Sequence, residues 1–139
     1  MGGLLTVPVV VLADDLMWST RIVEAVRRAG GSAVPLTSDE ELDVALEAYR
    51  LGDLNSISGA VVDLAARRFD GVAAIERVAA ARLPVLAVAE HDDQLTRRRA
   101  LKAGALRVFS YRKFFEDGTR LLEGWLAANA AGGAALEGE

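Results

Sequence analysis

The sequence contains no cysteine, which excludes disulfide bonds, thiolate catalysis and cysteine-bound zinc. His91 is the only histidine, so metal sites built from several histidines are removed and a Ser-His-Asp triad is disfavoured. Neither a glycine-rich phosphate-binding loop nor a nucleophile elbow is present. These absences disfavour an enzyme, and the lack of cysteine is typical of a reducing compartment.

Long apolar runs and strong positive charge are also missing. The stretch MGGLLTVPVVVLA has no positive charge before its apolar residues, is interrupted by Pro8, and is shorter than the roughly 20 residues of a membrane helix. We therefore expect a cytoplasmic protein that does not contact membranes. The net charge of −4 argues against direct nucleic-acid binding. A basic cluster at 97–102 follows acidic residues on a predicted helix and is interpreted as a solvated helix face.

Five short, valine-rich runs are separated by segments with helical spacing, which predicts strands that alternate with crossover helices. This order indicates a parallel sheet covered by helices on both faces. Ser38 and Glu41 have the spacing of a helix-capping box, and Gly104 is expected to end the fourth helix. We expect one domain over 1–129 and a flexible tail over 130–139. The predicted strands are 7–13, 32–36, 59–64, 83–89 and 106–111.

Three aspartates come at the ends of predicted strands. Asp14 and Asp15 follow the first strand, and Asp63 ends the third. Ligands of such sheets bind at the carboxyl ends of the strands, so these side chains are expected to converge. Converging carboxylates repel one another and need a cation, and an all-oxygen ligand set favours Mg²⁺. Alternatively, each aspartate only caps a helix or solvates the end of a strand.

The order and spacing of these motifs resemble the receiver domain of response regulators, over about residues 7 to 129. The resemblance rests on Asp14-Asp15, on Asp63 and on Asp70-Gly71 at the usual offset, followed by "LPVLAVAEHDD" and "LKAGALRVF". It implies a flavodoxin-like, doubly wound, five-stranded parallel sheet with (βα)5 order. It also implies a role in two-component phosphorelay signalling.

The resemblance assigns a role to each acidic position. Asp63 would be the phospho-acceptor, receiving its phosphoryl group from a histidine kinase or a phosphotransfer protein. Asp14, Asp15, Asp63 and the backbone carbonyl of Ala65 would hold Mg²⁺. A carboxylate that attacks a phosphoryl group neutralised by a metal ion is coherent chemistry.

Four family positions depart from the pattern. Ala89 replaces the Thr or Ser that would bind a phosphoryl oxygen, and Val108 replaces the aromatic switch residue. Tyr111 stands where a lysine is expected and Arg112 where a proline follows it. Lys113 could serve only if the strand or loop gained two residues. Metal binding is expected to survive these changes, whereas phosphoryl switching is expected to be weakened or lost.

Other polar and aromatic residues near these positions have two interpretations each. Arg67 and Arg68 either replace the missing lysine or are surface charges on a loop. Trp18 lies about one helical turn past Asp15 and is expected to pack within its helix close to the site. His91 is interpreted as a solvated loop residue rather than a phosphorelay histidine.

Two functional hypotheses remain. The first is a stand-alone receiver that accepts phosphate on Asp63, and the second is a pseudo-receiver that binds proteins without phosphoryl control. In both, the resemblance places the partner-binding face at about residues 93 to 126, where apolar and basic side chains occur together, and a homodimer through that face is left open. The residues singled out there are Phe114, Phe115, Arg97 and Arg98.

Overall fold

The computed structural model describes the backbone of residues 7–137 and the side chains of residues 7–128. Its five strands form one parallel sheet in the order β2-β1-β3-β4-β5. The strands are β1 (Pro8–Leu12), β2 (Ser32–Leu36), β3 (Gly59–Asp63), β4 (Val85–Ala89) and β5 (Arg107–Ser110). The helices are α1 (Leu16–Arg28), α2 (Asp39–Arg50), α3 (Gly71–Ala80), α4 (Gln94–Ala103) and α5 (Tyr111–Glu137). The predicted α/β class is confirmed, and β1 lies beside β3.

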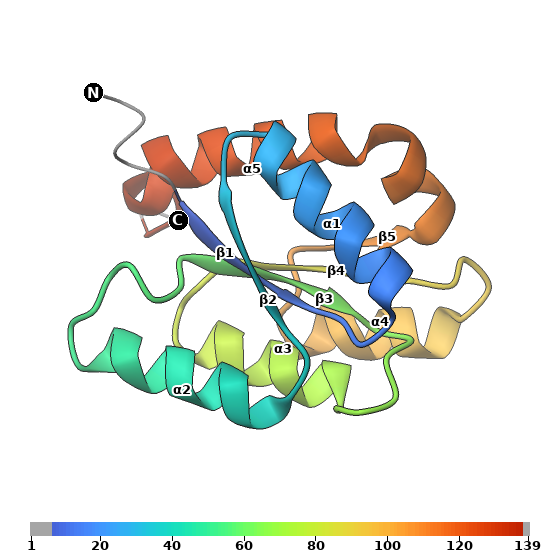
Figure 1. Ribbon diagram of the computed structural model, residues 1–139, viewed down its shortest axis with the longest axis horizontal. Coiled ribbons are helices and arrows are strands. Elements are labelled where there is room, and N and C mark those ends of the chain that lie inside the picture. Colours follow the sequence, from blue (N-terminus) through green and yellow to red (C-terminus); the bar gives the residue numbers. More distant parts are fainter. Residues whose placement is uncertain (1–6, 138–139) are drawn as a thin grey trace.

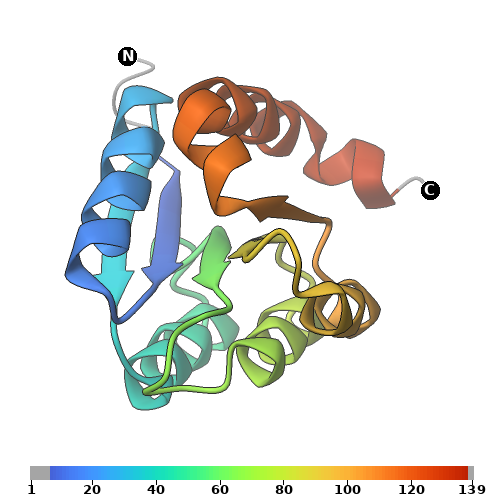
Figure 2. The ribbon, with the colours of Figure 1, turned by 90° about the vertical axis from the view of Figure 1, so that its right-hand side faces the viewer.

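Helices cover both faces of the sheet, with α1 and α5 on one side and α2, α3 and α4 on the other (Figures 1 and 2). Strands β3 and β4 are buried along their whole length, and β1 is buried beyond its first residue. Alternate residues of these strands enter two separate hydrophobic clusters, one under each helical layer. Continuous apolar runs are therefore what this sheet requires.

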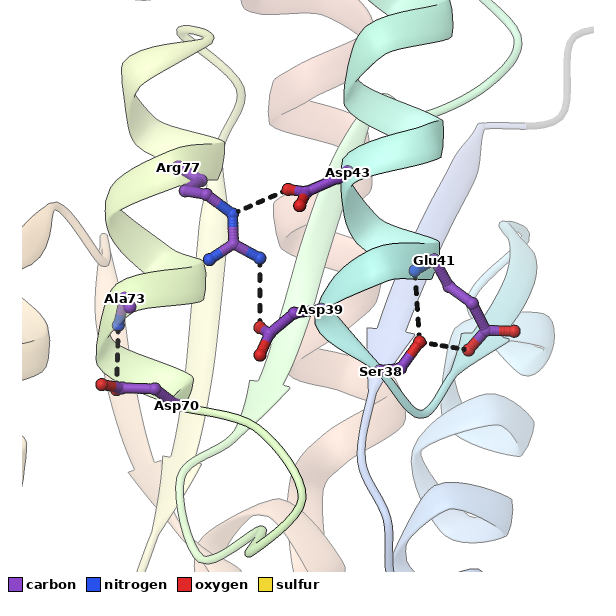
Figure 3. A network of polar contacts seen from close by, with 7 residues as sticks. All are labelled: Ser38, Asp39, Glu41, Asp43, Asp70, Ala73 and Arg77. Carbon is purple, nitrogen blue, oxygen red and sulfur yellow. Dashed lines mark hydrogen bonds and ion pairs between the residues drawn. The ribbon is translucent and has the colours of Figure 1, made fainter.

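The predicted helix ends are found where the sequence places them. The Ser38 hydroxyl accepts a hydrogen bond from the Glu41 backbone N–H at 3.2 Å and caps α2 (Figure 3). The Glu41 carboxylate accepts the Thr37 backbone N–H at 2.9 Å, one residue earlier than a capping box requires. Asp70 caps α3, and Gly104 ends α4 with a φ of 123°.

Arg77 joins the two helices on one face of the sheet. Its guanidinium on α3 lies 3.1 Å from an Asp39 oxygen and 3.0 Å from an Asp43 oxygen, both on α2 (Figure 3). All three side chains are partly exposed, so the pairs contribute modestly to stability. They connect the N-terminal half of α2 to α3.

The start of α5 differs from the prediction. The sequence predicts a strand that continues through Tyr111. In the structure, α5 begins at that residue, directly after β5. Phe114 then lies one turn into the helix, faces the sheet and is buried, whereas Phe115 stays 62% exposed. The prediction that Phe114 belongs to a partner-binding surface is therefore wrong.

The end of α5 also differs from the prediction. The helix continues to Glu137, so the predicted boundary at residue 129 falls inside it, and residues 138–139 lie outside the described chain. Alanine, the best helix former, is frequent in this stretch and favours the extension. Within residues 7–137, no helix is both long and apolar enough to cross a membrane.

Candidate functional site at the carboxyl ends of the strands

Asp63 is the last residue of β3 and, at 2% exposure, the one buried charged residue in the described part of the chain. Its Oδ1 accepts a hydrogen bond from the Ala65 backbone N–H at 3.0 Å. The same oxygen accepts a second hydrogen bond from the Tyr111 hydroxyl. A buried carboxylate needs such donors, because leaving it without partners would destabilise the fold.

Tyr111 reaches this site because α5 begins immediately after β5. As the first residue of the helix, Tyr111 lies at the carboxyl edge of the sheet, where β3 also ends. Its ring packs on Trp18 of α1, with ring centroids 4.5 Å apart and an interplanar angle of 47°. The sequence marks Tyr111 only as a lost lysine position, and nothing in it signals the contact with Asp63.

Asp14 connects the end of β1 to the loop between β3 and α3. Its Oδ2 accepts hydrogen bonds from the backbone N–H groups of Arg67, at 2.7 Å, and Arg68, at 2.8 Å. The site thus uses the backbone of these arginines. Their side chains are exposed, and neither forms an ion pair with any described residue.

Asp15 caps a helix, which is one of the two alternatives to metal binding that the sequence leaves open for each aspartate. Its Oδ1 accepts a hydrogen bond from the Trp18 backbone N–H at 3.1 Å and caps the N-terminus of α1. A carboxylate at this end also interacts favourably with the helix dipole. This cap places Trp18 one turn into α1, in reach of Tyr111.

The three aspartates line one open pocket of about 530 Å³, as do Ala65, Trp18 and Tyr111. An all-oxygen set of donors suits a hard cation. In the described residues, however, no three such side chains lie close enough together to hold one metal ion. One oxygen of each carboxylate accepts hydrogen bonds from the protein and the other accepts none from the described residues. The Mg²⁺ site of Asp14, Asp15, Asp63 and the Ala65 carbonyl stays a prediction.

Burial is the main cause of the raised pKa of Asp63, and the negative charges of Asp14 and Asp15 raise it further. Hydrogen bonds from Tyr111 and the Ala65 backbone oppose this effect in part. The pKa of Tyr111 is raised well above its usual range, mainly by burial and also by the hydrogen bond that its hydroxyl donates to Asp63. Tyr111 is thus held as a neutral donor to Asp63.

The remaining switch positions do not line the pocket around Asp63. Ala89 is buried at the end of β4, beside the Asp63 strand, and offers no hydroxyl. Val108 is a partly buried residue in the middle of β5. The Lys113 ammonium lies 2.9 Å from Asp117 on the same helix and lines a different pocket. Lys113 therefore does not replace the missing lysine in this structure.

Replacing Asp14 with alanine is expected to loosen the loop between β3 and α3. The change leaves two backbone N–H groups without their acceptor, which costs on the order of 1–2 kcal/mol of local stability. Limited digestion with trypsin tests this directly, because Arg67 and Arg68 are both cleavage sites. We expect faster cleavage there than in the wild type, with Asp14→Asn intermediate because it keeps an acceptor oxygen. Equal cleavage rates would show that Asp14 does not hold the loop.

Comparison with known proteins gives structural matches without sequence matches. No family model matches the chain, and no curated protein is significantly similar to it. A response-regulator receiver domain from Rhodospirillum rubrum is similar with a TM-score of 0.65 and 23% identity, over 87% of this chain and 94% of that one. A putative pilus assembly-related protein from Burkholderia pseudomallei has a TM-score of 0.66 and 22% identity, over 94% and 92% of the two chains.

A third match is the phosphorylated cyanobacterial phytochrome response regulator RcpA. It has a TM-score of 0.68 and 13% identity, over 88% of this chain and 93% of that one. At such low identities the likeness concerns the arrangement of the chain. That arrangement agrees with the five parallel strands and five helices described above. The chain therefore has the flavodoxin-like fold of response-regulator receiver domains.

Proposed function

We propose that this chain is a receiver-type signalling module that acts through protein contacts, without phosphoryl control and without being an enzyme. One observation carries the proposal: the Tyr111 hydroxyl donates a hydrogen bond to Asp63, the carboxylate that a receiver would phosphorylate. The site at the carboxyl edge of the sheet is then a structural cluster. It fixes the ends of β1 and β3, the start of α1 and the start of α5 relative to one another.

The neighbours of Asp63 support this proposal. Phosphoryl transfer depends on groups that neutralise the charge of the transferring phosphoryl group. Ala89 provides no hydroxyl here, and the Lys113 ammonium is paired with Asp117. The Asp14 carboxylate is committed to the loop backbone. The basic side chains that line the pocket are those of Arg67 and Arg68, on the loop between β3 and α3. A phosphoryl group at Asp63 would thus meet these two arginines, with no lysine and no serine or threonine hydroxyl in the pocket lining.

A second candidate function, a receiver that accepts phosphate slowly, is favoured by the other oxygen of Asp63. Its Oδ2 accepts no hydrogen bond from the described residues, and Asp63 lines an open pocket. That oxygen would attack the phosphorus of a phosphohistidine on a histidine kinase or phosphotransfer protein. The P–N bond would break, leaving aspartyl phosphate and free histidine. Mg²⁺ binding by the acidic cluster belongs to this candidate only.

Intact-mass measurement after incubation with acetyl phosphate and Mg²⁺ separates the two candidates. We expect the wild-type chain to keep its unmodified mass, because Tyr111 and Ala65 engage Asp63 and no lysine lines its pocket. A phosphoryl adduct on the wild type that is absent from Asp63→Asn would contradict the proposal and establish the second candidate.

The Tyr111→Phe variant tests the part played by the phenol. It keeps the ring on Trp18 and removes only the hydroxyl that donates to Asp63. If the site can be opened at all, an adduct should appear first in this variant. The same measurement on Tyr111→Phe combined with Asp63→Asn is the control for labelling elsewhere.

A further inference from the structure

Positive charge is concentrated in one stretch of an otherwise acidic chain. Residues 94–113, which cover α4, β5 and the start of α5, contain seven lysines and arginines and no aspartate or glutamate. Since the whole chain has a net charge of −4, the remainder carries −11. Arg112 and Lys113 form ion pairs with Glu116 and Asp117. The other five basic residues belong to α4 and β5, on the side of the molecule where the sheet ends, and form no ion pair with a described residue.

A pocket of about 430 Å³ lies on that side, along the edge strand β5. All four residues of β5 line it, so it follows the full length of the strand. Figure 2 shows β5 between α5 and α4, at the end of the sheet. The other lining residues are His91, Gln94, Arg97 and Lys113, and no carboxylate is among them.

Two guanidinium groups in this pocket carry uncompensated charge. Arg97 donates to the Val108 carbonyl at 3.1 Å, and its Nη1 is buried with no hydrogen-bond acceptor among the described residues. Arg107 lies over the Phe109 ring, 5.1 Å from its centroid. No described carboxylate lies within 4.0 Å of either arginine, so an acidic group from outside would gain two unpaired cations.

Apolar side chains accompany the charge. The large apolar residues of this stretch that remain about half exposed or more are Leu95, Leu101 and Leu106. Alternating basic and apolar side chains beside an edge strand suit an amphipathic protein segment. A nucleic acid has no apolar side chains to bury, and the net charge of −11 elsewhere would repel a polyanion.

We propose that the pocket along β5 binds an extended, acidic segment of a partner protein. Its carboxylates would lie against Arg97 and Arg107, and its apolar side chains against the exposed leucines. Because Arg97 already donates to the Val108 carbonyl, the segment would bind along this edge strand chiefly through side-chain contacts. This inference rests on the proposed role as a binding module, and it names the chemistry of the partner. The predicted solvated helix face at 97–102 is then part of a binding surface.

Fluorescence anisotropy tests the proposal with a labelled peptide of about ten residues that alternates glutamate and valine. The full chain is titrated at low salt with no phosphoryl donor present. We expect saturable binding that weakens as salt is added, and an affinity at least about tenfold lower for Arg107→Glu. The matched control is Arg27→Glu, which reverses an exposed arginine of α1 outside the pocket and should bind like the wild type.

The inference would be overturned if the acidic peptide did not bind, or if Arg107→Glu left its affinity unchanged. Two comparison probes, a lysine–valine peptide and duplex DNA, are titrated in the same way. Equal binding of the lysine–valine peptide, or tighter binding of the DNA than of the acidic peptide, would also overturn it. Circular dichroism of each variant establishes that it is folded. A chain that accepts phosphate yet binds the acidic peptide contradicts only the proposed phosphorylation independence. A chain that stays unphosphorylated and binds no peptide contradicts only this inference.

Discussion

Replacing Asp63 with asparagine is expected to stabilise the fold at neutral pH by on the order of 1–3 kcal/mol, as removal of a buried charge does. The asparagine oxygen can accept the same hydrogen bonds from Ala65 and Tyr111, since both fall on one oxygen of Asp63. The change therefore removes the negative charge and little else. It also relieves the repulsion by Asp14 and Asp15, which contributes to the raised pKa of Asp63.

The pH dependence of this gain follows from the direction of the pKa shift. Because the folded state raises the pKa of Asp63 above its unfolded value, the stability linked to its proton is fully present below the unfolded pKa. It is lost as pH rises through the folded pKa. Denaturant unfolding of both proteins from acidic to neutral pH should show an advantage of Asp63→Asn that grows with pH and then levels off.

The exposed acid Glu76 on α3 supplies the control for this experiment. Glu76→Gln removes the same charge from the surface, and we expect little change in the free energy of unfolding at any pH. If the wild type proved more stable than Asp63→Asn at neutral pH, an unrecognised cation or donor would have to stabilise the Asp63 carboxylate. That outcome would contradict a cluster held only by protein donors.

Replacing Gly104 with alanine is expected to destabilise the fold by about 3 kcal/mol, the sum of two effects. Gly104 has a φ of 123°, a conformation that side chains with a Cβ rarely adopt. A Cβ there would also lie 2.6 Å from the Ala79 Cβ on α3, far inside van der Waals contact. Gly104 ends α4 and leads into β5, so the pocket along β5 depends on this turn.

Three further variants separate the backbone cost of Gly104→Ala from the clash with Ala79. Gly30→Ala has a similar φ of 101° but no atom within 4 Å of the new Cβ, so it should show the backbone cost alone. Ala79→Gly removes the clashing methyl group, and combined with Gly104→Ala it should be less destabilised than the two single changes summed. Thermal and denaturant unfolding measure all four proteins. Equal losses for Gly30→Ala and Gly104→Ala would show that the Ala79 contact is relieved at no cost.

The sequence alone predicts most of the fold, because its signals are local. Continuous valine-rich runs mark strands buried on both faces, and Ser38 and Gly104 mark helix ends through side-chain capping and positive φ. The convergence of Asp14, Asp15 and Asp63 on one pocket is likewise predicted from their place at strand ends, and the pocket confirms it. Their role as metal ligands cannot be predicted from the sequence in the same way, since it depends on where each carboxylate oxygen points.

The contact between Tyr111 and Asp63 could not be predicted from the sequence. These residues are 48 positions apart, and their meeting depends on α5 beginning directly at the end of β5. The run around Tyr111 continues the pattern of the strand, so the sequence predicts a strand through Tyr111, whereas α5 begins at that residue. The loop backbone that binds Asp14 carries no sequence signal either, because any residue can supply an N–H.

We propose a structural role for the acidic cluster and a binding role for the basic residues along α4 and β5. The cluster holds together four chain segments at one edge of the sheet, chiefly through hydrogen bonds to Asp14 and Asp63. Ala89 and Val108 provide neither the hydroxyl nor the aromatic ring that the receiver pattern has at these two positions. Partner binding along β5 would then be continuous rather than switched.

The most direct test of the central claim is an alkaline ultraviolet titration of Tyr111 in the Tyr49→Phe chain, which has no other tyrosine. If the Tyr111 hydroxyl donates a hydrogen bond to the Asp63 carboxylate, no tyrosinate should form near the ordinary pKa of about 10 while the chain is folded. Adding Asp63→Asn should lower the titration midpoint. A tyrosinate transition near pH 10 in Tyr49→Phe, unchanged by Asp63→Asn, would contradict the claim that Tyr111 holds Asp63.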